Sequence, residues 1–331
     1  MRIEPASTAS GIGCRVSSDC FPATVTIDGL HPAELAWLFG FAKAPSFDWA
    51  KLRARGAITV ALEADSKEEP GARLNIDLED GQVSTASDGP AQLRVDRQHF
   101  LHPTLFPKSL NLCLAQQWAR AGILVVHGAG IALEECGTLI LGKKASGKST
   151  LAAAALVAGG KVVSDDWMLL GLGPNNQPYM ERLRQFMMLR HSASTSDILA
   201  KAPELPFRVS TERPKSTLAL SPTNDQFPGW HRVHQLWIMK RANPRPTRSQ
   251  SQTVAPSAGL SALISGSMPI LFGQDFHAEH QRLQYTLLHC LGLLRTSEAI
   301  SGLDVTEEAR RALKLLHSAG IGTGIESYRI D

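Results

Sequence analysis

The sequence predicts a mixed α/β fold that follows a β-rich N-terminal region. Three observations carry this prediction. Apolar and polar residues alternate with period two before residue 95, apolar strands alternate with helices after about residue 105, and a glycine-rich loop joins one such strand to a helix. We therefore expect a β-rich region over residues 1–105, with a role in substrate binding as one interpretation, and a second domain over 106–331.

The N-terminal region contains short predicted strands. Period-two alternation recurs at 23–28 and 58–62. Residues 73–86 predict a hairpin, because Asp80-Gly81 supplies the positive φ that a tight turn needs. A short helix is predicted to begin near Pro32.

The second domain alternates helices with apolar strands. The spacing predicts, in order, an amphipathic helix over 107–121, a strand over 123–126, a strand over 138–141, a helix over 150–157 and a strand over 161–164. Trp230 and Trp237 are predicted to anchor the core, with stacking on a nucleotide base as the alternative. Two helices, over 275–297 and 306–319, are expected to close the chain.

The segment 242–259 is rich in Pro, Ser and Arg and is predicted to be an exposed, mobile loop. It is interpreted either as a solvated connection or as a clamp for an acidic peptide or a phosphate. The basic residues available to such a clamp are Lys240, Arg241, Arg245 and Arg248.

Charge and cysteine content exclude several classes of function. Lys and Arg total 34 against 31 Asp and Glu, and a net charge of +3 argues against nucleic acid or an anionic membrane as the main partner. The five cysteines form no CxxC pair, which favours a reducing compartment, with the cytoplasm as the expectation. No signal sequence and no apolar run of about 20 residues is present, so no membrane span is predicted.

One segment fits the pattern GxxxxGK[ST] between a strand and a helix. Backbone N–H groups of such a loop turn inward around phosphate oxygens, and the following helix presents its positive end to them. Lys148 is predicted to reach the β and γ phosphates and Ser149 to bind Mg²⁺. The predicted nucleotide-binding residues are Gly142, Lys143, Lys144, Ala145, Ser146, Gly147, Lys148, Ser149 and Thr150. The alternative is a glycine turn that merely joins strand to helix.

Asp165 and Asp166 follow the predicted strand 161–164, at the sheet edge where ligands of open α/β sheets bind. One is expected to act on the substrate and the other on a metal or on structure; the alternative is a helix cap or solvated turn. His127 is predicted at the end of strand 123–126, one strand ahead of the loop strand. There it acts as a donor near the γ phosphate or a partner to an Asp, or it is a structural histidine.

The ordered set of His127, the loop 142–149 and Asp165-Asp166 resembles the catalytic domain of the HPr kinase/phosphorylase family, whose P-loop architecture is shared with the phosphoenolpyruvate carboxykinases. The resemblance covers residues 125–170. It implies that Lys148 binds phosphate, Ser149 binds Mg²⁺, Asp166 is the base toward the acceptor hydroxyl and His127 supports it. Asp165, the other carboxylate of the pair, is then the expected metal ligand. A glutamate-arginine-glycine signature, which supplies a metal-ligating Glu in that family, is missing from this sequence; Glu181, in Met180-Glu181-Arg182, is the candidate substitute.

Two departures from the family pattern concern the loop and the N-terminal region. Ala145 occupies a position where the family has glycine, and Lys143 and Lys144 add charge to the loop. Residues 1–105 do not resemble the N-terminal domain of HPr kinases; the architecture is more similar to HPr-kinase-related enzymes encoded beside peptide natural-product genes, some of which phosphorylate a serine of a lasso-peptide precursor. Relatives assemble into rings or smaller oligomers, so a homo-oligomer is one expectation of the resemblance.

The sequence therefore predicts a Mg²⁺-dependent kinase that transfers the γ-phosphate of ATP to a hydroxyl, with a serine of a peptide or protein as the expected acceptor. A small-molecule kinase is an alternative, because the phosphate machinery does not specify the acceptor. A nucleotide-binding switch without phosphate transfer is a second alternative. The sequence decides neither between ATP and GTP nor on phosphorylase activity.

Overall fold

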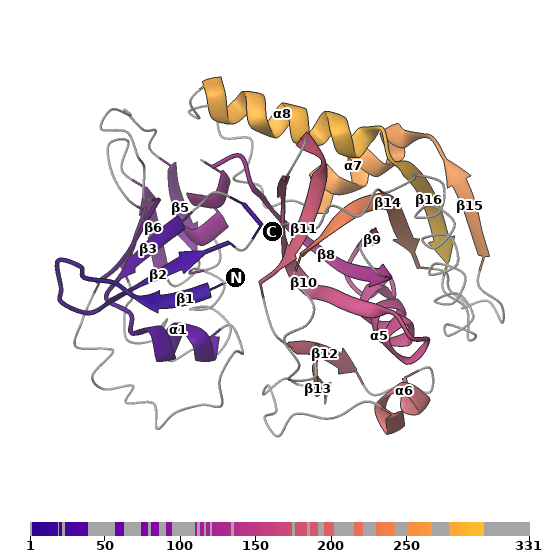
Figure 1. The fold of residues 1–331 in the computed structure, drawn as a ribbon, viewed down its shortest axis with the longest axis horizontal. Coiled ribbons are helices and arrows are strands. Elements are labelled where there is room, and N and C mark those ends of the chain that lie inside the picture. Colours follow the sequence, from indigo (N-terminus) through magenta and orange to yellow (C-terminus); the bar gives the residue numbers. More distant parts are fainter. Residues whose placement is uncertain are drawn as a thin grey trace, which may run out of the picture. The chain divides into compact units, whose positions relative to one another are not determined.

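The structure is a computed structural model with a mixed α/β fold (Figure 1). It describes residues 2–18, 20–21, 24–38, 57–62, 74–78, 81–85, 91–94, 110, 113–115, 117–119, 121–133, 136–173, 176–183, 186–190, 195–201, 215–220, 230–241, 250–266 and 278–300. The chain divides into two units, one of Met1–Val125 with Ser267–Thr286 and one of Val126–Gly266 with Leu287–Asp331. The expected boundary at residues 105–106 lies outside the described residues and stays a prediction.

The first unit contains a seven-stranded sheet in the order β1-β2-β3-β4-β7-β6-β5, and every neighbouring pair is antiparallel. Its strands are β1 (Arg2–Pro5), β2 (Gly13–Ser17), β3 (Thr24–Asp28), β4 (Ala57–Leu62), β5 (Leu74–Leu78), β6 (Gly81–Thr85) and β7 (Ala91–Arg94). β3 and β4 confirm the two strands predicted from alternation. β5 and β6 confirm the predicted hairpin, since Leu78 pairs with Gly81.

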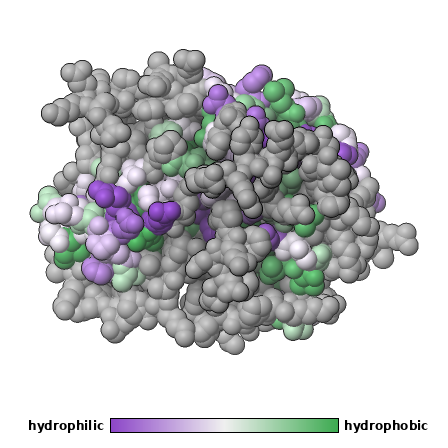
Figure 2. Space-filling view, in the orientation of Figure 1, coloured by the Kyte–Doolittle hydropathy of each residue, from purple (hydrophilic) through white to green (hydrophobic). Residues whose placement is uncertain are grey.

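The alternation of apolar and polar residues explains which side chains of this sheet are buried. Val25, Ile27 and Val60 are fully buried, whereas the outer strands carry charge, with Glu4 directly opposite Arg15. Figure 2 shows hydrophilic surface over β1 and β2, at the left of the view.

Helix α1 (Pro32–Leu38) confirms the helix predicted near Pro32. Pro32 is well suited to the first helical position, where the N–H it lacks has no partner in the helix. The Glu34 carboxylate accepts a hydrogen bond of 2.7 Å from the backbone N–H of His31. This reach back to the residue before the helix fixes where α1 begins.

The second unit contains a seven-stranded mixed sheet in the order β11-β10-β8-β9-β14-β16-β15. Its strands are β8 (Leu124–Leu133), β9 (Cys136–Leu141), β10 (Lys161–Leu172), β11 (Pro178–Arg182), β14 (Trp230–Lys240), β15 (Gln250–Val254) and β16 (Arg295–Ile300). β14 runs parallel to both β9 and β16. β11 also pairs with the start of β14, so β11, β10, β8, β9 and β14 close into a ring.

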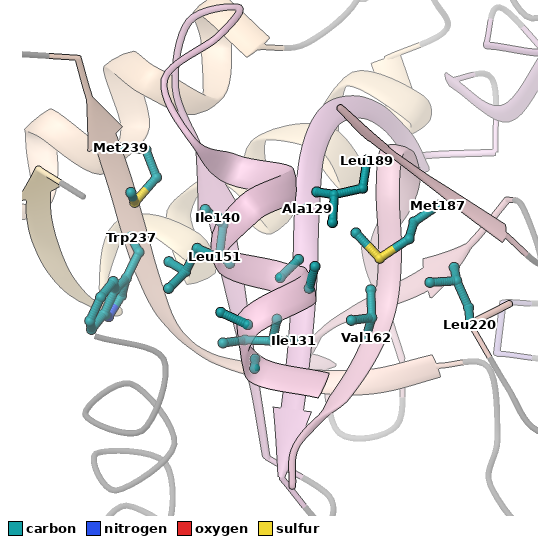
Figure 3. Close-up of a cluster of buried hydrophobic side chains, with 14 of the residues drawn as sticks. Ala129, Ile131, Ile140, Leu151, Val162, Met187, Leu189, Leu220, Trp237 and Met239 are labelled. Atoms are coloured by element: carbon teal, nitrogen blue, oxygen red, sulfur yellow. The ribbon is translucent and has the colours of Figure 1, made fainter. Parts of the chain in front are cut away.

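Helix α5 (Lys148–Val157) packs on one face of this sheet, and its five consecutive residues 151–155 are fully buried. Figure 3 shows the cluster around it, in which α5 lies against strand residues such as Ile140, Val162 and Trp237. A short two-stranded sheet, β12 (Phe186–Arg190) and β13 (Lys215–Ala219), adds Met187 and Leu189 to the cluster. Trp237 is fully buried, which confirms its predicted role as a core anchor.

Helix α7 (Pro256–Gly266) covers the other face. A Cβ on Gly259 would stand 2.8 Å from Leu236 and 2.7 Å from Thr296. Leu236 precedes Trp237 in β14, and successive strand residues point to opposite faces. Two further helices among the described residues are α6 (Ser196–Lys201) and α8 (Ala278–Gly292). No helix among the described residues is long and apolar enough to span a membrane.

Two strands are longer than the sequence analysis predicted. The strand expected over 123–126 runs to Leu133, so His127 lies inside β8 and not at its end. The strand expected to end before Asp165 continues to Leu172, so both carboxylates lie within β10. The reason is the ring, in which the second half of β10 pairs with β11 and that of β8 with β9.

Two predictions for the C-terminal third were wrong. The predicted loop 242–259 contains β15 and the start of α7; the described part, 250–259, is ordered because β15 pairs with β16 along its length. The predicted helix 275–297 ends at Gly292, and β16 follows because Thr296 and Ser297 are buried between strands on both sides. Residues 242–249 and the predicted helix 306–319 lie outside the described residues.

Candidate functional site

The glycine-rich segment joins β9 to α5, as predicted. Within it Gly142, Ala145 and Gly147 have positive φ of 140°, 65° and 103°. Alternation of left- and right-handed backbone is the conformation in which successive N–H groups converge on an anion. A Cβ on Gly142 would also collide with the carbonyl oxygen of Met239 in β14, so only glycine fits there.

The loop leads into the uncapped N-terminus of α5. Gly147 is the N-cap and supplies no side-chain hydrogen bond, and the first turn has no acidic residue. The Leu151 N–H donates a hydrogen bond of 2.9 Å to the Gly147 carbonyl. The N–H groups of the first turn therefore keep their partial positive charge for an external acceptor.

Two buried polar side chains, those of Ser146 and Lys148, can donate hydrogen bonds to a ligand at the loop. The hydroxyl of Ser146 is buried and finds no hydrogen-bond partner within the described part of the chain. The ammonium of Lys148, only 7% exposed, donates to the carbonyls of Gly142 at 2.7 Å and Lys143 at 3.1 Å. A ligand with several acceptor oxygens would satisfy both groups, so these residues fit a phosphate.

Lys148 is also coupled to the two predicted carboxylates. Burial lowers the pKa of Lys148 from its ordinary value, and the negative charges of Asp165 and Asp166 act in the opposite direction. The structure thus brings together three residues that the sequence analysis assigned to one site.

The two carboxylates have different surroundings. Asp165 is 4% exposed and accepts a hydrogen bond of 3.3 Å from the Met188 N–H of β12. Asp166 is about one-third exposed, and its Oδ1 lies 3.1 Å from Nε2 of His127. Successive strand residues point to opposite faces, and Asp166 in addition has a φ of +77° in the middle of β10. The expected division of roles between the two residues stays a prediction.

His127 is held from two sides. Besides Asp166, it meets the indole of Trp167, with ring centroids 5.4 Å apart and planes 38° apart. The sequence analysis singled out neither Trp167 nor Ser164, whose hydroxyl donates to the Trp167 carbonyl at 2.6 Å. The only sequence signal was their position on either side of the Asp-Asp pair.

The other predicted site residues differ in exposure. Lys143, Lys144 and Ala145 are exposed at the loop, and Ser149 and Thr150 are half-buried in the first turn of α5. Glu181 is fully buried in β11, opposite Leu169 of β10. Burial lowers the pKa of Arg182, and Glu181 opposes that shift, so a charge partner of Glu181 is its own neighbour. Its assignment as a metal ligand stays a prediction.

The donor set fits Mg²⁺ bound together with a nucleotide. Within the described ranges no three His, Cys, Asp or Glu side chains gather into a group that could hold a metal by themselves. Mg²⁺ in phosphate-transfer sites commonly takes one or two protein oxygens and completes its shell with water and phosphate oxygens. Ser149 with Asp165 or Asp166 offers oxygens of the required kind.

No protein-family model matches the chain, and no curated protein matches it. Among solved structures it is similar to the HPr(Ser) kinase/phosphatase from Coxiella burnetii, with 13% sequence identity and a TM-score of 0.27. That similarity covers 61% of this chain and 99% of the other.

Proposed function

We propose that this protein is a Mg²⁺-dependent phosphotransferase that moves the γ-phosphate of ATP to a hydroxyl, with a serine of a peptide or protein as the acceptor. The observation that carries the proposal is the meeting of Lys148, the uncapped start of α5 and the Asp166–His127 pair. The first two supply positive charge for the phosphates, and the pair supplies a base. Transfer from a phosphate to a hydroxyl needs both.

Separate groups of residues bind the phosphates and Mg²⁺. The loop N–H groups, Ser146 and Lys148 hold the β and γ phosphates and stabilise the charge that develops during transfer. Ser149 and Asp165 hold Mg²⁺, which when bound offsets negative charge on the phosphate oxygens.

Asp166 acts on the acceptor. Its carboxylate takes the proton of the hydroxyl while that oxygen forms a bond to the γ-phosphorus. The bond from the γ-phosphorus to the bridging oxygen breaks, and ADP leaves with its electron pair. The hydrogen bond from His127 keeps the carboxylate in place before the proton arrives.

The test is mass spectrometry of candidate acceptors after incubation with the protein, Mg²⁺ and ATP. Serine-bearing peptides and proteins form one set, and hydroxyl metabolites form a second. We expect a phosphate-sized mass increase on a peptide or protein serine. Asp166→Asn should reduce the rate by about 10²- to 10⁴-fold, the range for removal of a general base, with ATP still bound.

The matched control is Glu298→Gln. It neutralises a carboxylate of the same unit that pairs with Lys240 at 2.6 Å, and it should leave the rate unchanged. Full transfer by Asp166→Asn would remove the base from the proposal. Phosphate on metabolites alone would assign a small-molecule kinase, and ATP binding without any transfer would assign a nucleotide switch.

A further inference from the structure

The segment Ser164–Trp167 of β10 departs from regular strand geometry, and we call it the β10 kink. At its centre Asp166 has a φ of +77°, which an L-residue adopts only at a cost in conformational energy. At its ends the hydroxyl of Ser164, a fully buried residue, donates to the Trp167 carbonyl at 2.6 Å. One buried side chain therefore ties the two ends of the kink together.

The kink brings two successive side chains to one ring. In a regular strand, neighbouring residues point to opposite faces, so Asp166 and Trp167 could not both contact His127. Here Oδ1 of Asp166 lies 3.1 Å from Nε2 of His127, and the Trp167 indole lies 5.4 Å from the imidazole between centroids. His127 is thus held by a hydrogen bond and by ring contact at once.

The two carboxylates lie on opposite sides of β10, as neighbouring strand residues do. Asp165 lies on the buried side, where it accepts the Met188 N–H, and Asp166 lies on the partly exposed side with His127. A flattened strand could not bring both Asp166 and Trp167 to His127. The hydrogen bond made by Ser164 opposes that flattening, because without it the Trp167 carbonyl loses a partner inside the fold.

We propose that Ser164 and Trp167 are positioning residues that hold the Asp166 carboxylate in its reactive place. Ser164 fixes the backbone of the kink, and Trp167 fixes the ring that in turn holds Asp166. This role rests on the proposed function, in which Asp166 accepts the proton of the acceptor hydroxyl. Neither residue touches the reacting atoms.

The first test is the kinetics of Ser164→Ala and Ser164→Thr. Ser164→Ala removes the hydroxyl, and we expect kcat to fall about tenfold while KM for ATP stays near that of the parent, because the phosphate-binding loop is unchanged. Ser164→Thr keeps the hydroxyl and should restore most of kcat.

The matched control is Thr195→Val. Thr195 is a buried residue of the same unit whose hydroxyl donates to the Arg190 carbonyl at 2.7 Å, a bond of the same kind away from Asp166. Its loss should lower Tm about as much as Ser164→Ala does and leave kcat unchanged. Equal losses of kcat in the two variants would show a merely structural role and overturn the proposal.

A second variant covers the case in which Ser164→Ala does not fold. Trp167 is half-buried, so Trp167→Ala removes little of the core, and we expect kcat to fall severalfold with Trp167→Phe in between. Parental kcat in Trp167→Ala would overturn the role of the ring. A parent protein that transfers no phosphate to any acceptor overturns the proposed function and this role together, whereas parental kcat in Ser164→Ala overturns only the role of Ser164.

Discussion

Two segments interact with Lys148: the glycine loop of residues 142–147 through hydrogen bonds, and the β10 kink through the charges of Asp165 and Asp166. Each contains one non-glycine residue at positive φ, Ala145 in the loop and Asp166 in the kink. In the loop, the positive φ is part of the backbone pattern that turns N–H groups inward, and the Ala145 side chain is exposed. In the kink, the unusual backbone creates the contact with His127.

The two positions differ in whether the side chain takes part in the proposed function. Ala145 adds cost to a loop whose chemistry comes from backbone N–H groups and Lys148, so the side chain at 145 is expendable. Asp166 directs a carboxylate through its backbone, so the positive φ and the function are linked. The predictions below separate the two cases.

The largest effect is expected from Lys148→Ala, which removes the buried cation of the loop. Loss of a charged donor to the transferred phosphate should reduce transfer by about 10³-fold and weaken ATP binding, measured by product mass and by nucleotide titration. Lys161→Ala at the start of β10 is the control and should stay near the parent in both measurements. Strong transfer by Lys148→Ala would show that the loop does not hold the reacting phosphate.

Removal of His127 tests the kink. A hydrogen bond to a carboxylate contributes about 1.5–3 kcal/mol, and the low end applies because both side chains are about one-third exposed, 36% and 33%. His127→Ala should therefore lower kcat about tenfold. His127→Gln keeps an N–H near the position of Nε2 and should recover part of the loss. Equal rates for Ala and Gln would show that the hydrogen bond does not matter.

The pH dependence of ATP binding follows from the pKa of Lys148. Burial lowers this pKa, so the free protein loses the Lys148 proton, and with it phosphate affinity, below the pH of about 10.4 at which an exposed lysine titrates. Asp165→Asn removes a charge that opposes the shift, so the fall in affinity should begin at a lower pH than in the parent. A nucleotide titration at a series of pH values measures this. An unchanged midpoint in Asp165→Asn would contradict the coupling.

The loop could be predicted from the sequence and the kink could not, for a physical reason. Gly142, Gly147 and Lys148 each reveal by residue type the backbone or charge that the position requires. Ser164, Asp166 and Trp167 have no such signature, because a serine hydroxyl bonded to a nearby carbonyl is not a recognisable motif and the contacts with His127 come from another strand. The sequence identified Asp166 as a candidate and gave no sign of its backbone or its neighbours.

The strands show the same contrast. β3 and β4 have one buried face, so alternation identified them. β16 buries Thr296 and Ser297 between two strands, and β15 is an exposed edge strand, so neither has the apolar pattern of a strand. Pairing partners, which the local sequence does not encode, determine these elements.

A smaller effect is expected from Ala145→Gly, which should remove the conformational cost of the positive φ at this position in the loop. An L-residue in the left-handed region costs about 1–2 kcal/mol, and glycine loses about 0.4–1 kcal/mol through its more flexible unfolded chain. The variant should be more stable by about 0.5–1 kcal/mol, which corresponds to a rise in Tm of roughly 2 °C. Thermal unfolding without ligand measures it, and a fall in Tm would show that the Ala145 methyl group makes a stabilising contact.

The smallest change in stability is expected from Asp166→Gly. This variant gives the most direct comparison between the positive φ at Asp166 and that at Ala145. Glycine relieves the backbone at φ +77° as it does at Ala145, but Asp tolerates the left-handed region better than Ala does, so less strain is released. The substitution also removes the contact with His127, which offsets the gain. Tm should therefore stay near that of the parent while transfer is lost, whereas Ala145→Gly should raise Tm and keep transfer. If both variants raised Tm equally, the positive φ at Asp166 would only destabilise the fold. The hydrogen bond to His127 would then contribute nothing to holding the carboxylate in place.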